Sequence, residues 1–170
     1  MTQDSTLYFD FAATTPLDPE VLEAMMPYLT NQYGNANSAH HLGQRAKVVV
    51  EDAREQIAEL IGAEPSEIIF TSGGTESDNA VIQGAMSLAG EKNELVCSPA
   101  EHHAVLHPIE LCKLKGFVPV LVPINDEGTV TPSELNKVLS DRTALVSLMH
   151  VNNEIGSIKD VQQLADVCHA

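Results

Sequence analysis

The sequence is poor in basic residues and lacks any long hydrophobic run. Nine lysines and arginines stand against 24 aspartates and glutamates in 170 residues, giving a formal net charge of −15. A charge of this sign disfavours nonspecific binding to nucleic acid or to an anionic membrane surface. No apolar stretch approaches the about 20 residues that a membrane-spanning helix requires. We therefore expect no nucleic-acid partner and no membrane association.

The sequence is also poor in cysteine. Its three cysteines, Cys97, Cys112 and Cys168, form no Cys-x-x-Cys pair, and residues 1–10 lack the basic and apolar regions of a signal peptide. These features predict reduced thiols and a cytoplasmic location. Cys97 lies in a predicted buried strand and Cys112 on a predicted helix, so we interpret both as packing residues.

Two common nucleotide-binding motifs are missing as well. No Gly-x-Gly-x-x-Gly follows a predicted strand, and no Gly-Lys-Ser/Thr closes a phosphate-binding loop. The paired histidines at 40–41 and 102–103 have no cysteine or carboxylate at a spacing that would complete a zinc site. We predict no metal centre, and the usual nucleotide-binding folds become poor candidates.

Predicted strands alternate with predicted helices along the chain. This alternation is typical of an α/β protein with a mostly parallel sheet and flanking helices. Apolar alternation and runs predict strands at 7–11, 68–71, 94–98, 117–124 and 143–150. Capping residues and helical periodicity predict helices at 21–29, 42–61, 74–89 and 103–115, one short helix after Thr131, and a last one from Asp160. Pro27 predicts a kink or early stop in the first helix.

One stretch, residues 68–79, combines a β-branched run, two glycines and a helix start. The first turn of a helix has unpaired N–H groups and the positive end of the helix dipole. Gly73 and Gly74 would let the main chain approach an anion closely, with Thr75 and Ser77 as hydroxyl donors. Phosphate is the natural ligand, although a Gly-Gly turn capped by threonine also begins helices that bind nothing.

Polar clusters follow three of the predicted strands, at residues 72–75, 101–103 and 152–154. In parallel sheets, ligands collect beyond the carboxyl ends of the strands. His102 could stack on a planar ligand or move a proton, and Asn153 could bind a ligand hydroxyl. Both also have plainer readings, because histidine often caps a helix and Asn-Asn is ordinary turn sequence.

Four segments in their order along the chain resemble the cysteine desulfurases of the NifS/IscS type. These enzymes are class V members of the pyridoxal-phosphate aminotransferase superfamily, fold type I. The matching segments are residues 8–16, 70–79, 101–102 and 150–156. The resemblance implies an N-terminal segment at 1–18 and, at 19–170, the N-terminal part of the cofactor-binding large domain, with the C-terminal small domain absent.

The resemblance also implies roles for individual residues. Gly74 and Thr75 would bind the phosphate of pyridoxal 5'-phosphate. His102 would stack on the pyridine ring and serve as an acid/base group, and Asn153 would bond the cofactor's phenolic oxygen or the substrate. Asn35 is a weaker substrate-binding candidate, because residues 36–39 replace the proline and paired serines usual in that loop.

The implied reaction removes sulfur from L-cysteine, giving L-alanine and an enzyme persulfide for iron–sulfur cluster assembly or other sulfur transfer. The implied partners are L-cysteine, a second copy that forms a homodimer through the large domain, and a sulfur-acceptor or iron–sulfur scaffold protein. One alternative is another class V enzyme, such as a selenocysteine lyase or a small-molecule aminotransferase. Another is a non-catalytic truncated subunit that acts as an interaction module.

The sequence departs from the family pattern in what it does not contain. The family's cofactor-carrying lysine, persulfide cysteine, substrate-binding arginine and ring-pairing aspartate would all follow Ala170. We therefore expect an N-terminal fragment that has no desulfurase turnover alone. In the family's sheet, strands that this chain lacks separate the strand ending at Thr71 from the other three. We expect open sheet edges that favour association.

Overall fold

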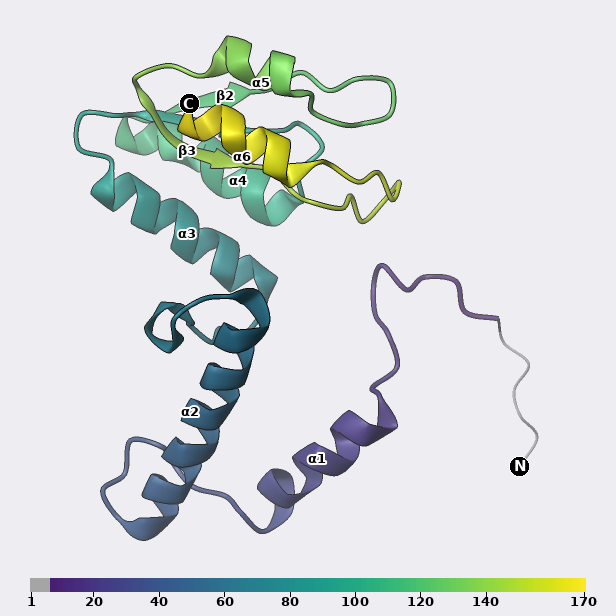
Figure 1. Cartoon of the computed structure of the whole chain (residues 1–170), viewed down its shortest axis with the longest axis vertical. Helices are drawn as coiled ribbons and strands as arrows, with labels where there is room; N and C mark the ends of the chain where they lie inside the picture. The colour runs from purple at the N-terminus through teal and green to yellow at the C-terminus, as the bar shows by residue number, and fades with distance from the viewer. Residues whose placement is uncertain (1–6) are drawn as a thin grey trace. The chain divides into compact units, whose positions relative to one another are not determined.

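The computed structural model describes residues 7–170 and divides the chain into two compact units (Figure 1). The first unit ends at Phe70 and the second spans Thr71–Ala170. Residues 1–6 of the predicted N-terminal segment lie outside the described residues. In the part that is described, no helix has the length and apolar character needed to cross a membrane.

The first unit is helical. It contains α1 (Pro19–Thr30), α2 (His41–Ile61) and a short 3₁₀ helix η1 (Pro65–Glu67). The Asp18 carboxylate caps α1 by accepting the Glu20 N–H at 2.8 Å. Of the kink or early stop predicted at Pro27, the early stop is wrong, because α1 continues through Pro27 to Thr30. The predicted amphipathic helix is confirmed as α2, which ends at Gly62 in a left-handed conformation (φ 70°).

Two predicted strands, at residues 7–11 and 68–71, are wrong. Neither segment is a strand, and Phe9 and Ile69 are 85% and 81% exposed. A strand needs a neighbour for its N–H and C=O groups, and in residues 7–70 the structure contains no other strand. The Ile68 carbonyl instead accepts a hydrogen bond from the Arg54 guanidinium, which lies 5.0 Å from the centre of the Phe70 ring.

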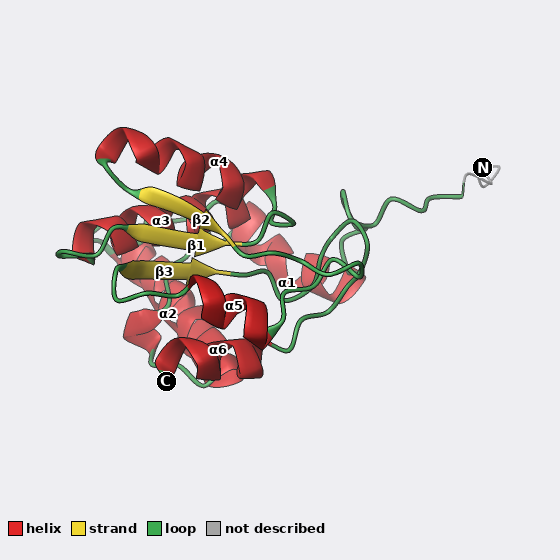
Figure 2. Ribbon diagram, turned by 90° about the horizontal axis from the view of Figure 1, so that it is seen from above, coloured by secondary structure: helices red, strands yellow, loops and turns green. Residues whose placement is uncertain are grey.

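The second unit is built on a parallel sheet with the strand order β2-β1-β3 (Figure 2). Its strands are β1 (Glu94–Cys97), β2 (Val118–Leu121) and β3 (Thr143–Ser147). Its helices are α3 (Gly74–Leu88), α4 (His103–Leu111) with the 3₁₀ extension η2 (Cys112–Lys115), α5 (Pro132–Val138) and α6 (Val161–His169). The predicted α/β class is confirmed, with β2 and β3 shorter than expected.

Helices cover both faces of this sheet, and β1 contributes to both cores (Figure 2). Successive side chains of a strand point to opposite faces. Leu95 and Cys97 pack with residues of α3 and α4, whereas Val96 packs with residues of α5 and α6. Cys112 joins the first core, and burial raises the pKa of Cys97 to about 11. The interpretation of both cysteines as packing residues is confirmed.

Two glycines of the second unit provide a matched test of these packing constraints. A Cβ at Gly84 in α3 would meet no atom within 4 Å, whereas Gly128 has a φ of 72° and a Cβ there would lie 2.5 Å from Ile155 Cδ1. We expect Gly84→Ala to raise the free energy of unfolding by about 0.5–1 kcal/mol through helix propensity. Gly128→Ala should lower it by about 1–2 kcal/mol. Urea denaturation followed by circular dichroism measures both, and changes of the same sign would contradict the assigned environments.

Candidate active site

The start of α3 forms a compact turn held by its own side chains. The Glu76 carboxylate accepts hydrogen bonds from the Ser72 hydroxyl at 2.6 Å and the Ser72 N–H at 2.7 Å, and these bonds lower the pKa of Glu76. The Ser77 hydroxyl lies 2.7 Å from the Thr71 hydroxyl and 3.3 Å from the Gly73 carbonyl oxygen. Ser77 therefore serves the turn, where the sequence had suggested a ligand donor.

Other polar groups of the same turn are left available. Among the described residues, the N–H groups of Gly74 and Thr75 and the Thr75 hydroxyl have no hydrogen-bond acceptor. A Cβ on Gly74 would meet no atom within 4 Å, so packing does not explain the glycine. Glycine in a helix costs about 1 kcal/mol relative to alanine. Its presence fits close approach by a ligand, and the donors and the helix dipole favour an anion.

His102 is the N-cap of α4 and is exposed. Its Nδ1 accepts the Ala104 N–H at 3.0 Å. A ring nitrogen that accepts a hydrogen bond carries no proton, so this bond assigns the proton of neutral His102 to Nε2. The ring face and Nε2 are consequently left for a ligand, while Nδ1 fixes the orientation of the ring.

Thr75 and His102 border the same hollow, which lies between α3 and α4 and has a volume of about 670 Å³. Asn79 and Gln83 line it from α3, and His103 lines it from α4. A smaller hollow of about 220 Å³ is also lined by His102, together with residues at and just beyond the end of β3. The structure thus brings the predicted phosphate-binding residue and the predicted ring-stacking histidine together.

The other two predicted site residues lie elsewhere. The Asn153 side chain donates to Glu154 Oε1 at 2.9 Å and lines neither hollow, although it follows the end of β3. Asn35 belongs to the first unit, where its side-chain oxygen accepts the Asn37 N–H at 2.9 Å. Their roles in binding stay predictions.

Two buried polar residues connect the ends of β1 and β3, and sequence reasoning had given neither of them a role. Glu101 is 7% exposed, and its two carboxylate oxygens accept the Met149 N–H at 2.9 and 3.1 Å. Asn152 is 6% exposed and donates to the Ala100 carbonyl oxygen at 3.0 Å. Its own side-chain oxygen accepts two N–H groups of the following turn. Polar residues directly after buried strands were the available signal, because a buried polar group requires partners.

The electrostatic environment of Glu101 is mixed. Burial raises the pKa of its carboxyl group, and the charge of Asp78 adds to this effect. The hydrogen bond from Met149 and the positive charge of Lys159 act in the opposite direction, since both favour the ionised form. The pKa of Glu101 is raised overall, so desolvation is the dominant influence.

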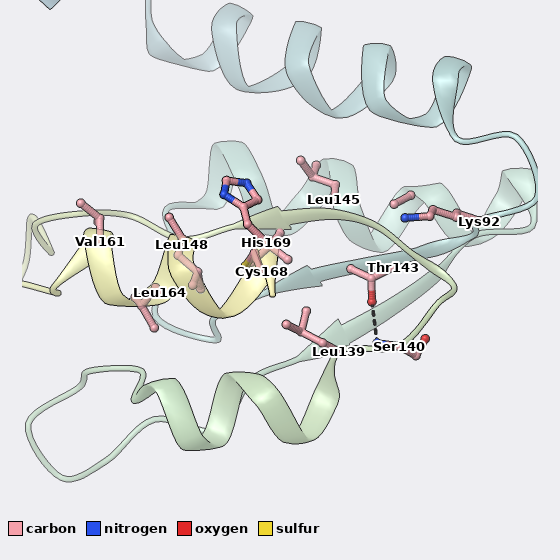
Figure 3. Close-up of a pocket in the computed structure, with 13 residues that line it drawn as sticks. Lys92, Leu139, Ser140, Thr143, Leu145, Leu148, Val161, Leu164, Cys168 and His169 are labelled. Atoms are coloured by element: carbon pink, nitrogen blue, oxygen red, sulfur yellow. Dashed lines mark hydrogen bonds between the residues drawn. The ribbon is translucent and has the colours of Figure 1, made fainter.

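A third hollow, of about 510 Å³, runs along β3 and α6 (Figure 3). Leu145, Leu148 and Leu164 form much of its lining, with Lys92 and His169 also bordering it. Cys168 lies in the same wall, and burial raises the pKa of its thiol. An apolar lining and an un-ionised thiol give this hollow little catalytic chemistry, so we place the active site at the start of α3 and α4.

A parallel α/β sheet, a helix start with free N–H and hydroxyl donors, and a histidine after β1 form an arrangement suited to a phosphorylated, planar ligand. The family model of the class-V aminotransferases matches residues 7–170. The chain belongs to this family, whose members depend on pyridoxal 5'-phosphate. The resemblance found in the sequence is thereby confirmed.

The relatives narrow the comparison to one kind of enzyme. The cysteine desulfurase IscS of Dictyoglomus turgidum is 48% identical over 162 residues, which are 95% of this chain and 41% of the relative. The mitochondrial cysteine desulfurase of Drosophila melanogaster is 43% identical over 171 residues, covering 99% of this chain and 37% of its own length. The chain therefore spans about two fifths of the curated relatives it matches.

Solved structures support the same grouping. A NifS-like protein superimposes with a TM-score of 0.90 at 40% identity, over 95% of this chain and 44% of the other. SspA, solved in complex with cysteine, gives a TM-score of 0.89 at 34% identity, over 96% of this chain and 48% of the other. Both likenesses cover nearly all of the present chain and less than half of the known one.

The buried carboxyl group of Glu101 predicts a specific pH dependence. Because its pKa in the folded protein is raised from 4.5, the folded state holds this proton more tightly than the unfolded chain. That stabilisation is present below about pH 4.5 and is lost as the pH rises through the folded-state pKa. We expect the free energy of unfolding of the wild-type protein minus that of Glu101→Gln to fall as the pH rises above about 4.5.

Urea denaturation at several pH values from acid to neutral measures this difference. Glu110→Gln is the matched control, because the Glu110 side chain on α4 is 64% exposed and pairs only with Lys113 among the described residues. The difference in free energy of unfolding between the wild-type protein and Glu110→Gln should not change with pH in this way. Parallel curves for wild type and Glu101→Gln would contradict the assigned burial effect.

Proposed function

We propose that this chain carries part of the cofactor site of a pyridoxal-phosphate-dependent cysteine desulfurase. The reaction would remove sulfur from L-cysteine, with L-alanine and an enzyme-bound persulfide as the products. The supporting observation is the shared hollow, because Thr75, which has free donors, and His102, whose imidazole is held by Ala104, both line it. The names of the relatives support cysteine as the substrate.

The donors present fit the cofactor. The N–H groups of Gly74 and Thr75, with the Thr75 hydroxyl, would hold its phosphate at the start of α3. His102 would lie against the pyridine ring and present Nε2 toward the substrate, where it can hold or move a proton. Asn153 would reach the ring's oxygen substituent or the substrate. Asn35 would bind the substrate. The bound cofactor would supply the electron sink for chemistry on the amino acid.

The wider assignment follows from the same relatives. IscS names among them support a role in supplying sulfur for iron–sulfur clusters or other sulfur transfer, through an acceptor or scaffold protein. We further propose a homodimer formed through the large domain. The free, buried thiols of Cys97 and Cys112 support action in a reducing compartment such as the cytoplasm.

Cofactor binding is best tested with pyridoxamine 5'-phosphate, since an amine cannot condense with surface lysines as the aldehyde does. We expect equilibrium dialysis to show saturable binding of pyridoxamine 5'-phosphate. Pyridoxamine, which lacks the phosphate, should bind about tenfold more weakly or worse. Thr75→Val should weaken binding of the phosphorylated compound about two- to tenfold by removing one hydroxyl donor.

Thr30→Val is the control for this measurement. Thr30 lies on the exposed end of α1, and its hydroxyl bonds only the Met26 carbonyl among the described residues. This variant should bind the phosphorylated compound as the wild-type protein does. Equal affinities for pyridoxamine and its phosphate, or equal affinities of the two threonine variants, would overturn the phosphate site.

The proposed reaction is tested on the gene product that carries these 170 residues. With cofactor and a thiol reductant, it should release sulfide from L-cysteine, and selenocysteine serves as the competing substrate. We expect His102→Gln to lower the rate by about 10²-fold or more, the scale of lost acid/base catalysis. Release of selenide without sulfide would instead assign a selenocysteine lyase.

A further inference from the structure

The unexplained feature of the second unit is a buried lysine. Lys159 is 2% exposed, and its Nζ has no hydrogen-bond partner among the described residues. Its main-chain N–H donates to the His150 carbonyl oxygen at 2.9 Å, which closes the loop that carries Asn152 and Asn153. Burying an unpaired ammonium group costs several kcal/mol, so a compensating charge is expected nearby.

The buried carboxyl group of this region is Glu101, and the positive charge of Lys159 favours its ionised form. Among the described residues no ion pair joins the two side chains, so the charge of Lys159 acts on Glu101 without direct contact. Two charged groups act on Glu101, Asp78 on α3 and Lys159 before α6, and the Met149 N–H beyond β3 donates a hydrogen bond to it.

The bonds of Glu101 connect the two strand ends that carry the candidate site. Its carboxylate holds Met149, just past β3, and its own main-chain N–H donates to the Ser98 carbonyl oxygen at 3.2 Å, just past β1. The next residue is His102, which caps α4. Asn152 makes the reverse connection to Ala100, and the next residue is Asn153.

We propose that Glu101 is a positioning residue for the site, and that Lys159 is the buried charge that keeps its carboxylate in this role. The pair fixes the β1–α4 turn against the loop after β3, and this sets where the His102 ring lies relative to a ligand held at Thr75. The inference rests on the proposed function for the identity of that ligand. Neither Glu101 nor Lys159 needs to touch it.

The test compares two ligands in four variants. Glu101→Gln and Lys159→Met remove one charge each at nearly constant size, with the surface variants Glu110→Gln and Lys113→Met as controls. Inorganic phosphate needs only the α3 start, whereas pyridoxamine 5'-phosphate also needs the ring position. We expect both buried variants to bind phosphate within about twofold of wild type, and pyridoxamine 5'-phosphate about fivefold or more weakly. Both controls should bind each ligand as the wild type does.

Each outcome decides the proposal. A parallel loss of affinity for both ligands would assign Glu101 a general structural role, and no loss for either would leave it no positioning role. If the wild-type protein binds phosphate but shows no additional affinity for pyridoxamine 5'-phosphate, the proposed function fails. Nitrogen NMR of the imidazoles then tests the positioning role of Glu101 by itself. The proposal then requires Glu101→Gln and Lys159→Met to shift the His102 nitrogens, with His107 as the internal reference. Unchanged His102 signals would overturn it.

Discussion

The candidate site depends on the central strand β1, because Glu101 and His102 follow it directly and Asn152 is hydrogen-bonded to the turn that it leads into. β1 is hydrogen-bonded to a strand on each side, and Leu95, Val96 and Cys97 are fully buried between two layers of helices. A strand held in this way cannot shift its register without exposing one core. The turn that follows it, with Glu101 and His102, therefore leaves the sheet at a fixed point.

Anion binding by a protein of net charge −15 requires local electrostatics to oppose the overall field. The start of α3 offers main-chain donors for this purpose, which no pH change removes. Glu76 is the acidic residue of this turn, and its carboxylate is directed at Ser72, where two hydrogen bonds hold it. The carboxylate thus stabilises the turn, while the N–H groups of Gly74 and Thr75 are left for a ligand.

Local sequence rules correctly predicted the helix ends that local interactions determine. Thr131 accepts the Glu134 N–H, Asp160 accepts the Gln163 N–H, and Gly62 ends α2, as capping patterns indicate. Such rules could not show that the strand predicted at 68–71 does not form, because a strand forms only where a distant segment pairs with it. The hollow shared by Thr75 and His102 could be foreseen from polar clusters at strand ends. The position after a buried strand pointed to this turn but not to which of its polar residues is buried, since Glu101 and His102 are adjacent and both polar.

At the ends of β1 and β3, two adjacent residues have different structural roles. At each, a buried polar residue holds the other strand end, and the next residue is exposed: Glu101 before His102, and Asn152 before Asn153. A side chain that satisfies buried main-chain groups has fewer donors and acceptors left for a ligand, and an exposed one is poorly placed to fix two strands together. Separating the tasks leaves the exposed residue with polar atoms that do not hold the strand ends, such as His102 Nε2, while its neighbour sets its place. Preorganisation of this kind lowers the entropy that binding would otherwise cost, because the exposed residue is already oriented before the ligand arrives.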